Sequence, residues 1–251
     1  MAKIIAVVNQ KGGVGKTTTA VNLTAALHDL GLKVLMCDYD PQANASSGLG
    51  VDKHKVKYSS YDVTINDIPI RDAIVETKFG DVLPSSADLA GAGVELIGVD
   101  HREKKLGEAL KEIREDYDVI FIDCPPSLEL LTLNALCAAD GILVPVQCEY
   151  YALEGLSDLM STLRTVKRRL NPRLDIFGVA LTMFDGRTNF STQVAQEVRR
   201  HFPGKVFATA VPRNVRLAEA PSHGLPVTAY DHLSRGAQAY KAMAEEIKAK
   251  L

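Results

Sequence analysis

Lysine, glycine and threonine residues are concentrated in one short segment near the N-terminus. Residues 9–18 read Asn-Gln-Lys-Gly-Gly-Val-Gly-Lys-Thr-Thr, and they follow the apolar run Lys3–Val8. Glycines let backbone N–H groups approach phosphate oxygens closely, and the N-terminus of a helix adds partial positive charge. The segment predicts a phosphate-binding loop between a strand and a helix, formed by Lys11, Gly12, Gly13, Val14, Gly15, Lys16, Thr17 and Thr18.

Two side chains of this loop carry the chemistry expected for a bound nucleoside triphosphate such as ATP. Lys16 would neutralise charge on the β- and γ-phosphates, and the Thr17 hydroxyl would coordinate Mg²⁺. The loop departs from the usual G-x-x-x-x-G-K-[ST] pattern, because Gln10 stands at the first glycine position and a second lysine, Lys11, begins the loop. The simpler alternative is a glycine-rich turn with solvated lysines.

Carboxylates come at the ends of two further predicted strands. Asp38 and Asp40 follow the strand Lys33–Cys37, and Asp123 follows the strand Val119–Ile122. Open α/β sheets bind ligands at the carboxyl ends of their strands. An apolar strand that ends in aspartate, downstream of a phosphate loop, predicts that Asp123 holds Mg²⁺, through water because Mg²⁺ retains several waters. For Asp38 and Asp40 the alternative is a solvated acidic turn.

Strand and helix patterns alternate along the chain and define the fold class. Near-continuous apolar strands separated by helices predict an α/β fold, with a mostly parallel twisted sheet covered by helices on both faces. Residues 1–251 are expected to form one domain, with 53–70 as an irregular surface excursion. Further strands are predicted at 79–83, 142–146, 176–181 and 206–209, and helices at 15–30, 102–115, 128–138, 152–170, 194–201 and 235–250.

Composition limits the class of protein. The chain has 251 residues, of which 46% are hydrophobic and 24% charged, as in ordinary globular proteins. No apolar run approaches the roughly 20 residues that span a bilayer, and the N-terminal run is too short for a signal peptide. We therefore expect a cytoplasmic protein. The four cysteines are too far apart for a C-x-x-C pair, so they are expected to be free thiols.

The loop of residues 11–18, with its extra lysine, resembles the deviant Walker A motif of the ParA/MinD group of P-loop ATPases. The resemblance implies hydrolysis of ATP by in-line attack of water on the γ-phosphate. It implies that Lys11 reaches across a nucleotide-sandwich homodimer to the partner's phosphates, as an arginine finger does. It also implies that Asp38 lies near Mg²⁺ and that Asp40 positions the attacking water.

Longer blocks are similar to the chromosome-partitioning (ParA/Soj) branch of this group. They cover residues 40–46, 145–155, 181–189 and 211–222, and one departure is Ala43, where glycine is more usual. The resemblance implies that Pro212, Arg213 and Asn214 frame the adenine, although an ordinary loop is the alternative. It also implies that Glu149 contacts the nucleotide or the partner subunit at the dimer interface.

The charge is divided unevenly along the chain. Residues 1–150 carry 14 basic and 22 acidic residues, a net charge of −8, whereas residues 151–251 carry 15 and 9, a net charge of +6. Basic side chains that neutralise phosphates give salt-sensitive binding to any DNA sequence. The resemblance implies that the ATP dimer binds nonspecific double-stranded DNA through Arg187 and Arg216 on the nucleoid. A ParB-type centromere-binding protein would stimulate hydrolysis and release the dimer.

Three alternative hypotheses about function are compatible with the same fold. A MinD-like ATPase that cycles on membranes would need a C-terminal amphipathic helix, but the apolar stripe of residues 240, 243, 244, 247 and 251 is better explained by core packing. An iron–sulfur protein would need two suitably placed cysteines, for which Cys124 and Cys137 are the candidates. A scaffold without catalysis is disfavoured, because Lys11, Lys16 and the acidic residues are all present.

Overall fold

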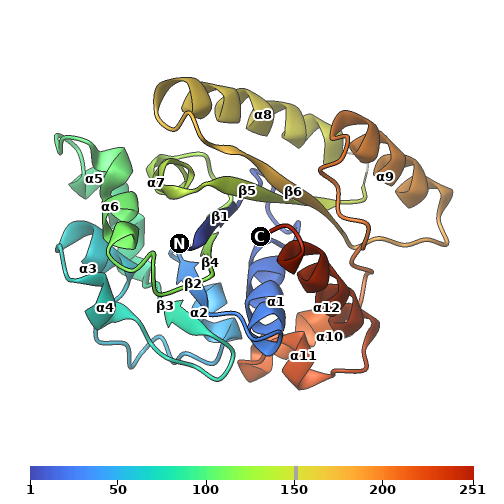
Figure 1. Cartoon of the computed structure of the whole chain (residues 1–251), viewed down its shortest axis with the longest axis horizontal. Helices are drawn as coiled ribbons and strands as arrows, with labels where there is room; N and C mark the ends of the chain where they lie inside the picture. The colour runs from blue at the N-terminus through green and yellow to red at the C-terminus, as the bar shows by residue number, and fades with distance from the viewer. Residues whose placement is uncertain (150–151) are drawn as a thin grey trace.

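A single six-stranded sheet forms the centre of the molecule (Figure 1). The computed structural model describes residues 1–149 and 152–251. All neighbouring strands run parallel, in the order β3-β2-β4-β1-β5-β6. The strands are β1 Lys3–Val7, β2 Val34–Asp38, β3 Asp81–Leu83, β4 Val119–Asp123, β5 Gly141–Gln147 and β6 Asp175–Thr182.

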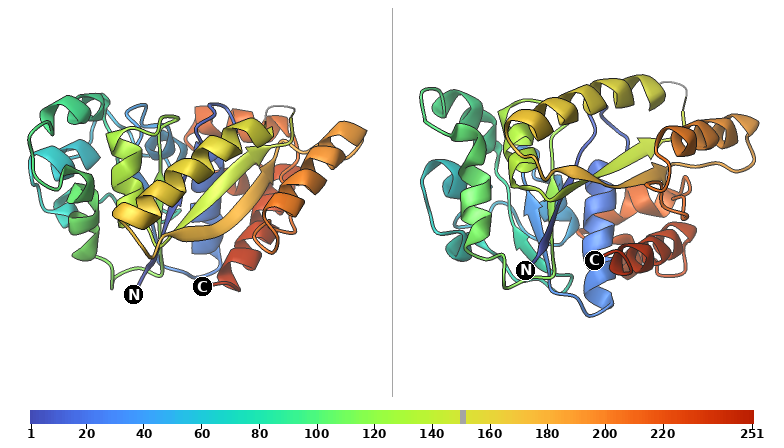
Figure 2. Two further views of the ribbon diagram at one scale, coloured as in Figure 1. Left: turned by 90° about the horizontal axis from the view of Figure 1, so that it is seen from above. Right: turned by 45° about the horizontal axis from the view of Figure 1, so that its top comes forward.

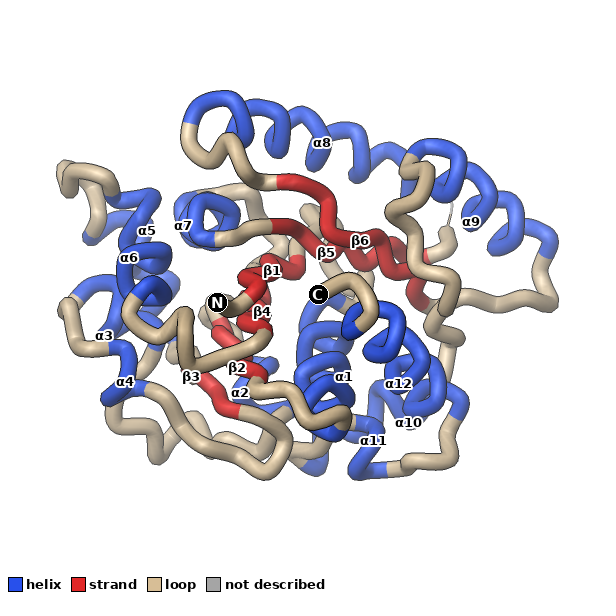
Figure 3. Tube along the Cα trace, in the orientation of Figure 1, coloured by secondary structure: helices blue, strands red, loops and turns tan. Residues whose placement is uncertain are grey.

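Helices cover both faces of this sheet. Figure 1 shows α6, α7 and α8 on one side, and α1 and α12 on the other. Figure 3 shows the strands enclosed between these layers. The helices are α1 Lys16–Asp29, α2 Asn44–Gly48, α3 Ser60–Ile65, α4 Ile70–Ala73, α5 Ala92–Glu95, α6 Lys105–Lys111, α7 Leu130–Ala138, α8 Ala152–Arg169, α9 Asn189–His201, α10 Val215–Glu219, α11 Val227–Tyr230 and α12 Arg235–Lys248, with short 3₁₀ turns at Ala87–Gly91, Arg102–Lys104 and Ala220–His223.

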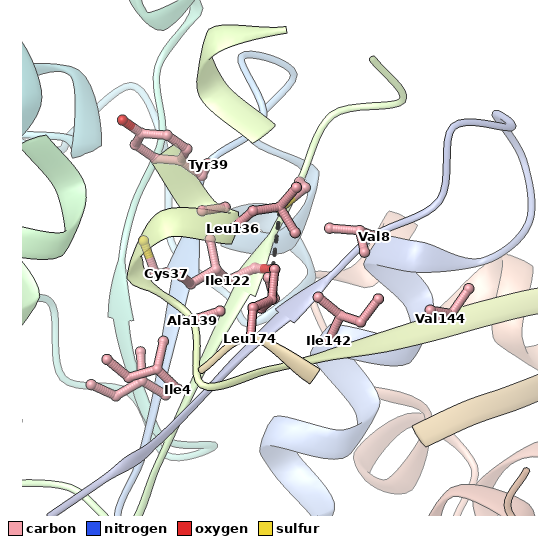
Figure 4. Packing of buried hydrophobic residues seen from close by; sticks show 14 of the residues in the cluster. Ile4, Val8, Cys37, Tyr39, Ile122, Leu136, Ala139, Ile142, Val144 and Leu174 are labelled. Carbon is pink, nitrogen blue, oxygen red and sulfur yellow. Dashed lines mark hydrogen bonds between the residues drawn. The ribbon is translucent and has the colours of Figure 1, made fainter. Parts of the chain in front are cut away.

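The alternation of side chains along each strand divides the core into two layers. In β1, Ile4 and Ala6 pack toward α6, α7 and α8, whereas Ile5 and Val7 pack toward α1 and α12. Figure 4 shows the first layer, with Ile4, Ile122 and Leu136 among its members. Because both faces are buried, the strands are apolar throughout, as the sequence predicted.

The register of the strands brings the predicted chemistry to one edge. Val7, the last residue of β1, pairs with Asp123 of β4, and Asp123 also pairs with Asp38 of β2. The two aspartates therefore end neighbouring strands beside the loop that follows β1. The parallel register alone explains why residues far apart in the sequence meet here.

The predicted fold class is confirmed, but several element boundaries differ. The expected strand 206–209 is wrong, because Val206 forms only an isolated bridge to Val179 at the edge of the sheet. The helix expected at 102–115 divides into a 3₁₀ turn and the shorter α6. The helix expected at 194–201 begins five residues earlier, since Thr188 caps its N-terminus by accepting a hydrogen bond from the backbone N–H of Ser191.

The segment expected as an irregular excursion contains an ordered helix. Ser59 and Asp62 form a capping box at the start of α3. The hydroxyl of Tyr39, which is fully buried, lies 3.0 Å from the Thr64 hydroxyl on this helix. Thus α3 packs directly against the segment that carries Asp38 and Asp40. Within the described residues, no helix is long and apolar enough to cross a membrane.

Candidate nucleotide-binding site

The loop between β1 and α1 has the backbone shape that the glycines predicted. Gly13 and Gly15 have φ angles of 75° and 88°, in the left-handed region that favours glycine. A Cβ atom at Gly12 or Gly13 would meet no atom within 4 Å, so the loop is open on that side. Gly15 is the N-cap of α1, which directs the first N–H groups of that helix toward the loop.

Lys16 lies inside this loop rather than in solvent. Only 7% of the residue is exposed, and its Nζ donates a hydrogen bond to the backbone carbonyl of Lys11 at 3.3 Å. Burial lowers the pKa of Lys16, and the nearby negative charges of Asp123 and Asp40 partly offset that effect. The ammonium group is therefore held between the loop and the acidic edge of the sheet.

Two buried side chains that the sequence analysis missed hold the loop in place. Asn9 donates from Nδ2 to the carbonyl of Pro145 at 2.7 Å and accepts from the Lys11 N–H at 3.0 Å. Thr182, at the end of β6, donates to the carbonyl of Val14 at 2.8 Å. Each is a polar residue at the carboxyl end of an apolar strand, which is the signal that could have identified them.

Asp123 is the strongest candidate for a metal-binding group. It is fully buried, and its two carboxylate oxygens have no hydrogen-bond partner among the described residues. Burial raises its pKa well above the usual range, the charge of Asp38 raises it further, and the nearby Thr17 hydroxyl lowers it. Burying a carboxylate without a partner costs folding free energy, and a cation with its water shell would supply both the positive charge and the hydrogen-bond donors that the carboxylate lacks. The residues present therefore fit Mg²⁺.

Asp38 is already satisfied by protein donors. Its Oδ2 accepts hydrogen bonds from the backbone N–H and the hydroxyl of Ser46, at 2.7 and 2.6 Å. Its Oδ1 accepts from the N–H of Asp40 at 3.3 Å. Complete burial nevertheless raises the pKa of Asp38 to about 6. These contacts suit a carboxylate that anchors α2 better than one that binds a metal directly.

Asp40 belongs to the same edge of the sheet and is slightly more exposed than Asp38 and Asp123. It is 9% exposed, and its Oδ1 accepts a hydrogen bond from the backbone N–H of Gln42 at 3.0 Å. Its charge acts on Lys16, Asp38 and Asp123. The structure thus gathers Lys16, Thr17 and the three aspartates around one place.

A cavity of about 370 Å³ lies next to the loop, with Gly15 and Thr18 in its wall. Its volume suits a heterocyclic base. Pro212, Arg213 and Asn214 line it, as does Met183, whose φ of 49° is unusual for a non-glycine residue. The predicted base-framing residues and the phosphate loop therefore share a continuous site.

The segment around Asn214 is fixed by local contacts. The Asn214 side chain caps α10 by accepting from the backbone N–H of Arg216 at 2.9 Å. The guanidinium of Arg213 donates to the Glu149 carboxylate at 3.1 Å. Glu149 is thereby linked to the rim of the base cavity. The neighbouring residues Tyr150 and Tyr151, which belong to the block 145–155, lie outside the described residues.

The two arginines expected to bind DNA lie on the surface and pair with carboxylates. Arg187 is 89% exposed and donates from Nε and Nη2 to the two oxygens of Asp185, at 2.9 and 2.8 Å. Arg216 is 46% exposed and contacts Glu219 at 2.7 Å and Asp231 at 3.2 Å. Neither arginine lines the base cavity.

The burial of α12 and of Cys124 bears on the membrane-cycling and iron–sulfur hypotheses. Tyr240, Met243, Ala244 and Ile247 of α12 are buried, which agrees with core packing of that stripe, whereas Leu251 is 48% exposed. Cys124 is fully buried, which does not suit a cluster shared between two subunits. In residues 1–149 and 152–251, no three His, Cys, Asp or Glu side chains form a metal-binding group.

Comparisons of the sequence with known proteins agree with this geometry. The family model described as an AAA domain matches residues 2–176. The sporulation initiation inhibitor protein Soj of Bacillus subtilis is 54% identical over 251 residues, which cover 99% of each chain. The chromosome partitioning protein ParA of Myxococcus xanthus is 51% identical, over 98% of this chain and 88% of that protein.

Solved structures share the fold over nearly the whole length. The cell division ATPase MinD of Pyrococcus furiosus superposes with a TM-score of 0.81 at 32% identity, covering 100% of both chains. A protein from Mycobacterium smegmatis described as cobyrinic acid a,c-diamide synthase, with bound ADP and magnesium, gives a TM-score of 0.85 at 38% identity, over 98% of this chain and 93% of that one.

Proposed function

The chain belongs to the ParA/Soj family of chromosome-partitioning ATPases, and from this premise we propose that it is a DNA-binding switch that Mg-ATP closes into a homodimer. One observation carries the proposal: Lys16 is buried close enough to Asp123 for their charges to interact, and the Asp123 carboxylate has no hydrogen-bond partner within the described residues, next to an open glycine loop. A bound cation would neutralise the charge of the Asp123 carboxylate, and a bound polyphosphate would neutralise the charge of the Lys16 ammonium. Residues 1–251 act in this proposal as one domain.

Each residue of the site has a distinct role in binding ATP. The backbone N–H groups of the loop and the Lys16 ammonium bind the phosphates, and the base enters the cavity beside Pro212 and Asn214. Mg²⁺, when bound, would neutralise negative charge that develops on the phosphates during hydrolysis. The Thr17 hydroxyl and the Asp123 carboxylate would hold it, with Asp38 close by at the end of the neighbouring strand.

Hydrolysis requires a positioned water and a positive charge at the γ-phosphate. Asp40, the least buried of the three aspartates, would orient the attacking water. Lys11 reaches the partner's phosphates in the dimer and stabilises the transition state. Catalysis then depends on dimerisation, and Glu149, linked to Arg213, lies at the interface of the two subunits.

The cellular role follows from the basic half of the chain. Two subunits would present Arg187 and Arg216 in duplicate, so ATP-driven dimerisation would double the phosphate contacts with DNA. The dimer would associate with the nucleoid in the cytoplasm. A ParB-type centromere-binding protein would then stimulate hydrolysis and release the dimer, which moves chromosomes or plasmids.

The test is DNA binding by the purified protein without nucleotide, with ADP and with ATP, over a series of salt concentrations. The Asp40→Ala variant holds the ATP state, because it should bind ATP without hydrolysing it. We expect binding only with ATP, to any sequence, weakening steeply as salt rises. ATP-driven dimers that bind no DNA would refute the DNA-switch proposal.

Binding of those dimers to vesicles of anionic lipid would instead favour a MinD-like membrane cycle. The burial of the α12 stripe argues against that outcome. The double variant Arg187→Ala, Arg216→Ala serves as the matched control, because it should still dimerise with ATP but should no longer bind DNA. Loss of the dimer in this control would show that the arginines have another role.

A further inference from the structure

A short segment after β3 holds large apolar side chains out in solvent. Val94 is 71% exposed and Ile97 is 68% exposed, and Val99 nearby is 38% exposed. Figure 1 shows this segment, around α5, at the rim of the molecule above α3. Figure 2 shows it at the end of the molecule where the loop after β1 also lies. The segment therefore lies at the same end of the molecule as the phosphate loop, and none of Val94, Ile97 and Val99 lines the base cavity.

The exposure of these side chains is imposed by the fold. Leu89, Ala92 and Leu96 of the same segment are buried in the core, which fixes its opposite side toward solvent. The backbone is ordered by hydrogen bonds from the Leu96 N–H to the Ala92 carbonyl and from the Ile97 N–H to the Val94 carbonyl, both at 3.0 Å. Val94 and Ile97 are thus two exposed apolar side chains three residues apart on an ordered backbone, so a partner could contact them without first ordering the segment.

Acidic side chains stand beside this surface. Glu95 accepts a hydrogen bond from the Tyr61 hydroxyl on α3 at 2.9 Å, and it is exposed. Two serine hydroxyls connect Asp62 and Asp88 on the same side of α3: Ser59 Oγ lies 3.0 Å from Asp62 Oδ2 and 3.2 Å from Ser86 Oγ, which lies 3.4 Å from Asp88 Oδ2. Arg102 and Lys104, which follow the segment on a 3₁₀ turn that contacts α7, are also exposed, so the acidic character is confined to the side that faces α3. A ligand for this surface should therefore combine positive charge with apolar side chains.

The segment is also connected to the catalytic edge by hydrogen bonds. The Ser46 hydroxyl, which donates to Asp38, accepts from the backbone N–H of Ser85 at 3.1 Å. The Pro84 carbonyl accepts from the N–H of Ser60 at the start of α3, at 2.7 Å. Residues 84–97 therefore connect to Asp38 at one end, through Ser46, and carry the exposed apolar residues at the other end. Between these ends they contact α3.

Two buried hydroxyls at this connection lack partners. Ser60 Oγ and Ser85 Oγ have no hydrogen-bond partner among the described residues. Unsatisfied buried hydroxyls are rare in native structures, and a small shift of the segment could supply partners. The connection is thus suited to a second arrangement that would move Ser46 and, with it, Asp38.

We propose that Tyr61, Val94 and Ile97, flanked by Asp88 and Glu95, form the docking surface for a basic, apolar-containing segment of the partner protein that stimulates hydrolysis. The inference rests on the proposed function, because it names where the stimulating partner binds. Docking places the partner's apolar side chains on Val94 and Ile97 and its cations beside the carboxylates. The 84–97 segment transmits the shift to Asp38 and Asp40.

The experiment measures ATP hydrolysis by the full chain, with DNA, against the concentration of the full-length ParB-type protein from the same organism. In the Val94→Ser, Ile97→Ser variant, the partner concentration for half-maximal stimulation should rise about tenfold, as expected for loss of central apolar contacts. The basal rate and ATP-dependent DNA binding should stay unchanged. Leu233→Ser is the matched control, because Leu233 is 76% exposed and lies before α12.

The charge contribution is tested separately. Asp88→Asn with Glu95→Gln should weaken stimulation at low salt, and the difference from the unaltered chain should shrink as salt rises. In the Asp40→Ala protein with ATP, partner binding should slow amide exchange at residues 94–99 and alter it at residues 38–46. These readouts do not depend on turnover.

The possible failures are distinguishable. Stimulation of the Val94→Ser, Ile97→Ser variant at the same partner concentration as the unaltered chain would overturn the docking surface and leave the proposed function intact. Loss of the ATP dimer in that variant would overturn it too, by assigning the surface to subunit contact. If the partner fails to stimulate even the unaltered chain, the partner role in the proposed function fails and the docking surface falls with it.

Discussion

The Nζ of Lys16 donates a hydrogen bond to the backbone carbonyl of Lys11, so the two lysines of the loop are directly connected although their exposure differs. Lys16 is buried against Asp123, whereas Lys11 is partly exposed at the start of the loop. The buried lysine is suited to the nucleotide of its own subunit, and the outer one can reach a second subunit.

Substituting these lysines separately should divide binding from dimerisation. Lys16→Ala should weaken ATP binding on the order of 100-fold, because a charged hydrogen-bonding group contributes roughly 2–3 kcal/mol. Lys11→Ala should keep the ATP affinity of the monomer and lose ATP-dependent dimers and hydrolysis. Fluorescent-nucleotide titration and light scattering measure the two effects. Equal loss of nucleotide affinity in both variants would contradict the division of roles.

The carboxylates paired with the surface arginines should restrain DNA binding. Asp185 occupies the Nε–H and one Nη2–H of Arg187, so it competes with a phosphate for the bidentate side of the guanidinium. Asp185→Asn should therefore increase DNA affinity of the ATP dimer a few-fold, and Arg187→Ala should lower it. Each lost phosphate contact should reduce the slope of log affinity against log salt by about 0.9.

Filter binding of labelled duplex DNA at several salt concentrations measures these slopes. Glu197→Gln is a suitable control, because Glu197 is also a surface acid beside an arginine, Arg200, at 3.9 Å, but without the bidentate contact. If Asp185→Asn binds DNA no better than this control, the carboxylate does not compete with phosphate at Arg187.

Local patterns were sufficient to predict the phosphate loop and the aspartates, because each depends on a few residues next to one strand. The parallel sheet was predictable for the same reason, since apolar runs and helices alternate regularly. Asn9, Ser46 and Thr182 were missed, because their hydrogen-bond partners lie far along the chain and appear only after the strands align. The expected strand at 206–209 failed because Val206 lies at the sheet edge, where a β-like composition does not ensure a ladder.

The side-chain oxygen and the side-chain amide nitrogen of Asn214 have separate possible contacts, and two substitutions can distinguish their contributions. Its Oδ1 caps α10, and its amide can donate to a base in the cavity. Asn214→Asp should keep the cap and lose the donor, so it should lower discrimination of ATP from GTP without lowering stability. Asn214→Ala should lose both, with a loss of about 1 kcal/mol in the free energy of unfolding. Competition binding and urea denaturation provide the two measurements.

Ala43 stands where glycine is more usual, and the backbone conformation at this position explains why glycine is favoured there. Its φ is 52°, which costs a non-glycine residue roughly 1 kcal/mol or more. Ala43→Gly removes that strain but increases the freedom of the unfolded chain, so the net gain in unfolding free energy should be about 0.5 kcal/mol. The same change at Ala45, which lies within α2, should destabilise and serves as the control. A loss of stability in both variants would show that strain at Ala43 is negligible.

Stability of the nucleotide-free protein should fall as pH rises through the range in which Asp38 titrates. Burial raises the pKa of Asp38 from its usual 3.8 to about 6, so between these values the folded protein holds a proton that the unfolded chain has released. Raising the pH removes that proton from the folded state alone and lowers the free energy of unfolding, by on the order of 3 kcal/mol in total. The buried Asp123, whose pKa is also raised, acts in the same direction.

Urea denaturation at intervals between pH 4.5 and pH 7.5, without Mg²⁺ or nucleotide, would measure this dependence. The Asp38→Asn variant should show a shallower dependence, because its side chain has no proton to lose while its oxygen can still accept the two hydrogen bonds from Ser46. Acid-induced loss of other ion pairs acts in the opposite direction in both proteins, so the difference between the two curves isolates Asp38. Parallel curves would mean that Asp38 is ionised throughout this range, and that Ser46 and the surrounding N–H groups solvate its charge as well as water does.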